Sequence, residues 1–240
     1  MGKISKKELS DFIAPNIDQF RKKLLENLLS LKLDKLLKRK NPYLFKAKAV
    51  DTAQDIVKSV LDAHLSSQEE GIFGGFLEEL AIFVCGKVYN GRKSSAEGID
   101  LEFDADSVHY IISIKSGPNW GNSSQTKKLK DNFRKAKRIL GAKIHVVAIN
   151  GCCYGKDARP NKGDYLKLCG QQFWRLISGD EHFYLDIIEP LGVHAKSKNE
   201  QFKEEYSKVI NRFTVEFAKQ YCDKNGAILW EALVKFNSGK

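Results

Sequence analysis

The chain has 240 residues, enough for one large domain or for a domain with an added helical region. Its 42% hydrophobic residues can fill a core, and its 29% charged residues favour a soluble protein. The 40 Lys and Arg residues outnumber the 30 Asp and Glu residues, for a net charge of +10. A field of that sign favours polyanions, with nucleic acid first and an acidic membrane surface second.

The cysteines and the apolar runs indicate where the protein works. Five cysteines, two of them adjacent and none in a C-x-x-C pair, argue against both a disulfide framework and a structural zinc site. No apolar run approaches the roughly 20 residues that span a bilayer, and "MGKISKKELSDF" lacks the apolar core of a signal peptide. We therefore expect a soluble protein of the reducing cytoplasm, with no membrane partner.

The first third of the sequence predicts helices. Leucines recur at near-helical spacing over residues 5–40, and Pro42 breaks this pattern. A second helix is expected over 49–65, and the glycines at 71, 74 and 75 are expected to open a third over 74–87. The leucine-rich segment at 20–40 is either intramolecular core or a dimer interface.

The periodicity changes after this third helix. "GIDLEF" and "HYIISIK" are short apolar runs separated by the polar turn "DADS", which predicts a β-hairpin. Residues 124–140 predict a strongly basic helix that stops at Gly141. A buried strand is expected over 143–150, and a last helix over 199–222.

The predicted hairpin brings an acid and an amine together. Because side chains alternate along a strand, Asp100 on the first strand and Lys115 at the end of the second can share one surface. Such a pair can hold a hard divalent cation beside a water molecule that must lose its proton. The simpler interpretation is that both residues are charges that keep the strand ends soluble.

A further oxygen ligand is expected from the helix before the hairpin. Its apolar stripe is Phe76, Leu77, Leu80, Phe83 and Val84. On a helical wheel Glu79 lies about 100° from the centre of this stripe and Glu78 about 160°. We therefore expect Glu79 to reach inward and Glu78 to face water.

The order helix, hairpin, basic helix and strand resembles the core of the PD-(D/E)xK nucleases. The segment "GIDLEF…YIISIKSGPNWGNSSQ" is similar to type II restriction endonucleases, and the likeness covers roughly residues 40–190. The resemblance implies an α/β (α+β) fold with a central mixed β-sheet flanked by helices. It implies a nuclease core over 71–195, a helical region over 1–70 that embraces DNA or dimerises, and a helical region over 196–240, in one compact domain overall.

The resemblance also implies site residues. The aspartate of the family falls on Asp100 and its lysine on Lys115, whereas the acidic position two residues before the lysine falls on Ser113. Glu79 is the leading substitute for the missing carboxylate, followed by Glu97, Glu102 and Glu78. The backbone carbonyl of Ile114 is the remaining metal ligand. One or two Mg²⁺ ions held there would support hydrolysis of a DNA phosphodiester by direct attack of water.

The segment after Lys115 offers contacts to double-stranded DNA. Amide, hydroxyl and aromatic side chains suit base edges and phosphates, and the basic helix and the loop beyond it supply cations. The expected DNA-binding residues are Ser116, Asn119, Trp120, Asn122, Ser123, Ser124, Gln125, Lys127, Lys128, Arg134, Lys156 and Arg159.

These expectations leave three functions open. The leading one is a type II restriction endonuclease that acts as a homodimer and is paired with a DNA methyltransferase, since cutting both strands of a palindrome needs two sites related by a two-fold axis. The alternatives are a structure-specific repair or recombination nuclease on the same core, and a non-catalytic basic DNA-binding protein.

Overall fold

A computed structural model describes residues 2–141, 143–193 and 199–239. The chain divides into two compact units. One unit contains Met1–Ile17 and Phe73–His194, and the other contains Asp18–Ile72 and Ala195–Lys240. Two helices, α1 (Lys6–Leu29) and α4 (Ala53–Tyr89), each contribute one part to each unit. No helix among the described residues has the length and apolarity needed to cross a membrane.

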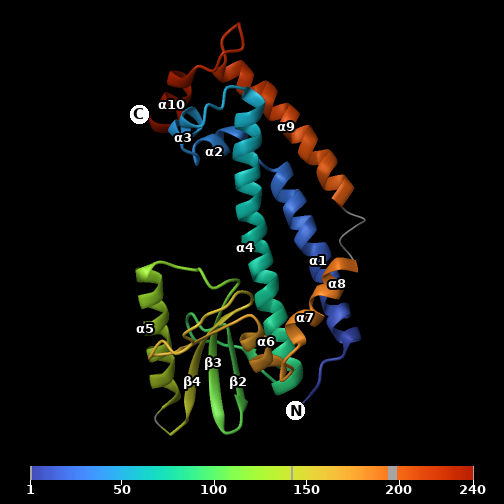
Figure 1. The fold of residues 1–240 in the computed structure, drawn as a ribbon, viewed down its shortest axis with the longest axis vertical. Helices are drawn as coiled ribbons and strands as arrows, with labels where there is room; N and C mark the ends of the chain where they lie inside the picture. The colour runs from blue at the N-terminus through green and yellow to red at the C-terminus, as the bar shows by residue number, and fades with distance from the viewer. Residues whose placement is uncertain (1, 142, 194–198, 240) are drawn as a thin grey trace. The chain divides into compact units, whose positions relative to one another are not determined.

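The first unit is built around a mixed sheet of five strands. The strands lie in the order β1 (Arg92–Lys93), β2 (Leu101–Ala105), β3 (Val108–Lys115), β4 (Val146–Cys152) and β5 (Leu166–Cys169). The first three are antiparallel neighbours, whereas β3, β4 and β5 run parallel. Figure 1 shows β2, β3 and β4 side by side, with α5 (Ser123–Leu140) next to β4.

Helices cover both faces of this sheet, as the alternation along β3 requires. Ile112 and Ile114 pack with the second part of α4 and with α6 (Gln171–Ser178). Ile111 points to the opposite face and packs against Leu129 and Phe133 of α5. Two short helices, α7 (Phe183–Asp186) and α8 (Ile188–Val193), follow α6. This α+β arrangement confirms the expected mixed sheet flanked by helices.

The second unit is helical. It combines parts of α1 and α4 with α2 (Leu33–Leu37), α3 (Pro42–Ala47), α9 (Asn199–Tyr221) and α10 (Trp230–Ser238). Its core is apolar and includes Leu28, Leu36, Val60, Phe213 and Phe217. The leucine-rich segment of the sequence therefore supplies intramolecular core here.

One expectation about the helices is wrong. The two helices predicted over 49–65 and 74–87 are one continuous helix, α4, which passes through Gly71, Gly74 and Gly75. Each glycine costs a helix about 1 kcal/mol, and the buried residues that precede and follow the cluster offset this cost. The expected break at Pro42 is confirmed, because Asn41 before it is extended. A short helix then begins at Pro42, since proline is tolerated at the first helical position and the Asn41 side chain caps the helix.

Candidate active site

The β2–β3 hairpin places Asp100, Ser113 and Lys115 on one surface. Leu101 pairs with Ile112, so the next positions outward, Asp100 and Ser113, lie opposite each other. Lys115 Nζ is 3.9 Å from Asp100 Oδ2. The structure therefore brings together the acid and the amine that the sequence singled out.

Hydrogen bonds fix the Asp100 carboxylate. Its Oδ2 atom accepts a bond of 2.6 Å from the backbone N–H of Ile114 and one of 3.3 Å from the Ser113 hydroxyl. Lys115 Nζ in turn donates to Ser113 Oγ at 3.3 Å and to the Ile114 carbonyl at 2.7 Å. Ser113, at the position where the resemblance expects an acid, thus links the carboxylate to the amine.

The expectation about the two neighbouring glutamates is wrong: Glu78 is half-buried and Glu79 is exposed. Burial raises the pKa of the Glu78 carboxyl, and the negative charge of Asp100 raises it further. Lys93 and Lys115 act in the opposite direction, with Lys93 Nζ 4.0 Å from Glu78 Oε1. Glu78 is therefore the helix carboxylate whose charge interacts with the Asp100–Lys115 pair.

The reversal follows from the small residues of α4. Ala81, Cys85 and Val88 are buried along with the larger side chains of the stripe, whereas Phe83 is only partly buried. Including them and leaving out Phe83 moves the centre of the buried face by about 60°, so that Glu78 lies about 100° from it and Glu79 about 160°. A wheel drawn from large residues alone misplaces the face.

Glu97 and Glu102, the other candidate ligands, are engaged elsewhere. Glu97 forms ion pairs with Lys128 and Lys135 of α5. Glu102 accepts bonds from Arg92 and from the Ser94 hydroxyl. Neither interaction involves Asp100 or Lys115.

The donors at the hairpin suit a hard divalent cation. No cluster of three His, Cys, Asp or Glu side chains able to hold a metal occurs within the described part of the chain. The oxygen donors available near the hairpin are instead two side-chain carboxylates, of Asp100 and Glu78, and one backbone carbonyl, of Ile114. The negative charge of Asp100 raises the pKa of Glu78, so a cation held by both carboxylates would relieve their repulsion, and all three groups are oxygen donors.

Several of the residues expected to contact DNA have hydrogen-bond partners within the protein. Asn122 caps α5: its side chain accepts from the backbone N–H of Gln125, whose own side chain accepts from the backbone N–H of Asn122. Ser124 also donates to the Asn122 side chain. The pattern Asn-x-x-Gln before an amphipathic run is a capping-box signal that the sequence contains.

The basic residues expected to contact DNA differ in their surroundings. Arg134 binds Asp131 and Asp164, and Lys128 pairs with Glu97. Exposed side chains among the expected DNA contacts include two lysines, Lys127 and Lys156, and two polar residues, Asn119 and Ser123. Ser116 is half-buried. The backbone N–H of Arg159 donates to Asp157, a carboxylate that also binds Lys162 and Lys167. Trp120 is half-buried, and its indole N–H donates to Asn150 at 2.8 Å.

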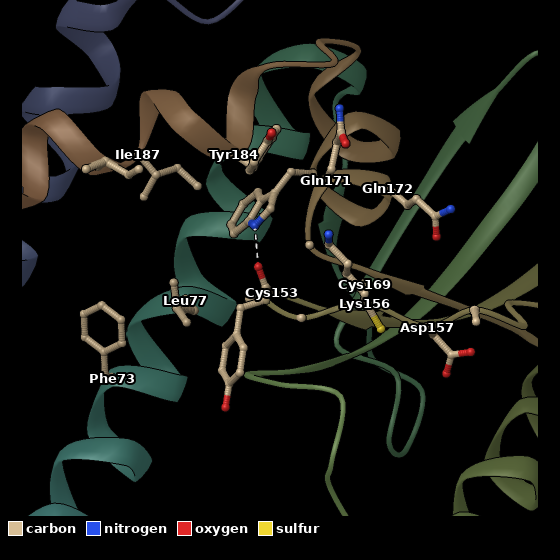
Figure 2. Close-up of a pocket in the computed structure, with 16 residues that line it drawn as sticks. Phe73, Leu77, Cys153, Lys156, Asp157, Cys169, Gln171, Gln172, Tyr184 and Ile187 are labelled. Carbon is tan, nitrogen blue, oxygen red and sulfur yellow. Dashed lines mark hydrogen bonds between the residues drawn. The ribbon is translucent and has the colours of Figure 1, made fainter.

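A pocket of about 790 Å³ is lined by residues of α4, α6 and α7 and of the loop after β4 (Figure 2). Figure 2 shows Phe73 and Leu77 of α4 at one side of it and Tyr184 and Ile187 at another. The Trp174 indole N–H donates to the Cys153 carbonyl at 2.7 Å and closes part of its wall. Neither Asp100 nor Lys115 lines the pocket. Its lining combines apolar side chains with the polar ones of Lys156, Asp157, Gln171 and Gln172.

Together, the mixed sheet, its flanking helices and the acid and lysine at one end of the hairpin define a restriction-endonuclease-like fold. The model of the family "Type II restriction endonuclease EcoO109I" matches residues 7–199, and the chain belongs to this family. It is therefore a nuclease of the site-specific restriction type, a class that generally uses divalent metal ions. A search of curated proteins found no match.

Proposed function

We propose that this protein is a Mg²⁺-dependent type II restriction endonuclease that cuts both strands of double-stranded DNA by phosphodiester hydrolysis. The observation that carries the proposal is the approach of Lys115 Nζ to 3.9 Å from Asp100 Oδ2, beside the Ile114 carbonyl. Asp100, Glu78 and that carbonyl would hold the metal, and Glu78 takes the place that the sequence assigned to Glu79. When bound, Mg²⁺ would neutralise the scissile phosphate and polarise the attacking water.

The side chains divide the remaining work. Asp100 keeps one oxygen for the Ile114 N–H and the Ser113 hydroxyl, which orients the carboxylate. Lys115 presents its ammonium group next to that carboxylate, where it orients the attacking water and stabilises charge developing on the phosphate. Ser113 supplies no charge of its own, so the second carboxylate has to come from the helix.

DNA binding is proposed to involve the amino-terminal part of α5 and the segment before it. Asn119, Ser123 and Lys127 are exposed close in sequence to Lys115. Lys127 is a cation without an ion pair among the described residues, which suits it to phosphate. The loop with Lys156 is a second candidate.

We further propose that the protein acts as a cytoplasmic homodimer alongside a DNA methyltransferase that protects the same sites. Two-fold symmetry supplies one site for each strand of a palindrome. The free thiols of all five cysteines fit a reducing compartment.

A digest tests the proposal directly. The full-length protein is incubated with several long duplex DNAs in Mg²⁺ or EDTA, alongside Asp100→Asn as a matched control. Discrete, reproducible fragments in Mg²⁺ alone, absent with the variant, support restriction. Cutting that depends on junctions or flaps would instead identify a structure-specific nuclease. DNA binding without cleavage under all conditions would identify a non-catalytic binder.

A further inference from the structure

The indole ring of Trp120 lies beside the amine of Lys115. Lys115 Nζ is 5.5 Å from the centroid of this ring. A cation at that distance from an aromatic face is attracted by the quadrupole of the ring. The amine is therefore bounded by the Trp120 ring as well as by Ser113 Oγ and the Ile114 carbonyl.

A buried amide holds the ring in place. Asn150 of β4 is fully buried, and its Oδ1 atom accepts the indole N–H of Trp120 at 2.8 Å. Its Nδ2 atom donates to the Ser113 carbonyl at 3.1 Å, which ties it to the strand that carries Lys115. Asn150 and Ser113 are register partners in the parallel β3–β4 pair, so one side chain connects both strands and the indole. A buried amide with both ends bonded adopts one orientation.

The backbone around Trp120 is also fixed. The Pro118 carbonyl accepts a bond of 2.8 Å from Lys167 Nζ. Gly117 lies so close to Tyr154 that a Cβ atom there would be 2.3 Å from the tyrosine ring. The segment that carries the indole is thus anchored to β5 and to the loop after β4, in addition to the Asn150 bond.

We propose that Trp120 and Asn150 are positioning residues for Lys115. Asn150 orients the indole, and the indole holds the ammonium group against Asp100. This inference rests on the proposed hydrolytic function and assigns Trp120 a role through the lysine, in place of the DNA contact that the sequence favoured. Since the indole N–H is already bonded within the protein, it is not available as a donor to DNA.

Single-turnover cleavage of a duplex that contains a mapped site tests this role. The limiting rate reports the reaction, and the enzyme concentration at half of that rate reports DNA binding. Trp120→Leu removes the aromatic face, so we expect the limiting rate to fall about tenfold with the half-saturating concentration unchanged. Trp120→Phe keeps a ring but loses the bond to Asn150, and we expect a smaller fall of about threefold. Asn150→Leu removes the same hydrogen bond by replacing its acceptor, the buried amide.

The matched control is Trp230→Leu. Trp230 also lies beside a lysine, with Lys46 Nζ 5.1 Å from its ring centroid, but it belongs to the other unit. We expect this variant to cleave at the wild-type rate. A higher half-saturating concentration for Trp120→Leu, at an unchanged limiting rate, would mean weaker DNA binding. It would make Trp120 a DNA contact and overturn the inference. So would wild-type behaviour in both parameters.

A spectroscopic measurement separates this inference from the proposed function. In protein labelled with ¹³C at lysine Cε, the ring current of Trp120 should displace the Lys115 signal, which is assigned by its loss in Lys115→Arg. Trp120→Leu should return the signal to the main lysine envelope, and an undisplaced wild-type signal would overturn the inference. If the wild-type protein cuts no DNA, the proposed function is overturned, and this spectrum alone decides whether the indole holds the amine.

Discussion

The carboxyl groups of Glu78 and Asp100 interact across the edge of the site. Burial raises the pKa of Glu78, and the negative charge of Asp100 raises it further. The two residues come from different elements, the helix α4 and the chain just before β2. Their proximity makes Glu78, and not its neighbour Glu79, the side chain to test as the second carboxylate ligand.

Replacing the two glutamates one at a time tests this assignment. We expect Glu78→Gln to lower the limiting cleavage rate about a hundredfold, equivalent to about 2.7 kcal/mol, because a metal would lose a charged ligand. Glu79→Gln is the matched control, since Glu79 is exposed, and its rate should stay within about twofold of wild type. The measurement is single-turnover cleavage at saturating Mg²⁺. The reverse order of effects would return the role to Glu79.

The same substitution should have the opposite effect on stability. A folded-state pKa above the unfolded value means that the folded protein binds this proton more tightly, so stability is lost as the pH rises through the folded pKa. Glu78→Gln removes that loss. In EDTA we expect its thermal midpoint to exceed the wild-type value at pH 7 and to match it below about pH 4, where the glutamate is protonated in both states.

Magnesium provides a second comparison for this variant. A ligand that binds only the folded protein raises the midpoint, so Mg²⁺ should stabilise the wild type more than Glu78→Gln. If Glu78→Gln were less stable than wild type at pH 7 in EDTA, the charged Glu78 side chain would stabilise the fold. The expectation that its charge destabilises the folded protein would then be wrong.

The dependence of DNA affinity on salt should separate two cations of α5. Lys127 is exposed, whereas Arg134 binds the carboxylates of Asp131 and Asp164. The plot of log K against log salt concentration has a negative slope. We expect Lys127→Gln to make this slope shallower by about 0.9, the value for one lost phosphate contact. Arg134→Gln should change the slope less, because its charge is already neutralised. Equal slopes for Lys127→Gln and wild type would exclude a phosphate contact there.

The contribution of Asp157 to the free energy of unfolding should depend on pH. A hydrogen bond from Lys162 is the largest cause that lowers the pKa of Asp157 to about 2, followed by one from the Arg159 backbone. With the folded pKa below the unfolded value, its contribution is present above the unfolded pKa and is lost between about pH 4 and pH 2. Asp157→Asn should cost about 1–2 kcal/mol at pH 7 and progressively less in acid.

Urea unfolding at several pH values measures this difference. Asp11→Asn, at an exposed carboxylate of α1, is the control and should be close to neutral. A constant difference between Asp157→Asn and wild type from pH 7 to pH 3 would contradict the assignment.

The sequence predicted the hairpin and the basic helix because their signals are local. Alternation assigns Ile111 and Ile112 to opposite faces, and a polar turn between two apolar runs fixes the pairing. The same alternation put Asp100 and Lys115 on one surface. The relative position of two residues on a short hairpin can be predicted from the sequence, since few residues separate them.

Other features depend on packing that a local pattern does not contain. The strand β5 has only four residues, and three of them are half-buried, so it shows no alternation. The choice between Glu78 and Glu79 depends on Ala81 and Cys85, whose small side chains weigh little in a hydrophobic pattern but are fully buried. Asn150 looks like an ordinary polar residue near a strand end until its two partners are known.

The turn of the hairpin lies at the far end of β2 and β3 from Asp100 and Lys115. Asp106 and Ser107 form it, with φ values of 50° and 60°, a backbone region that asparagine and glycine adopt at less cost. This part of the hairpin is therefore not optimised for stability and is separate from the candidate site. It is a suitable point for attaching a fluorophore or inserting a peptide tag while leaving Asp100 and Lys115 untouched.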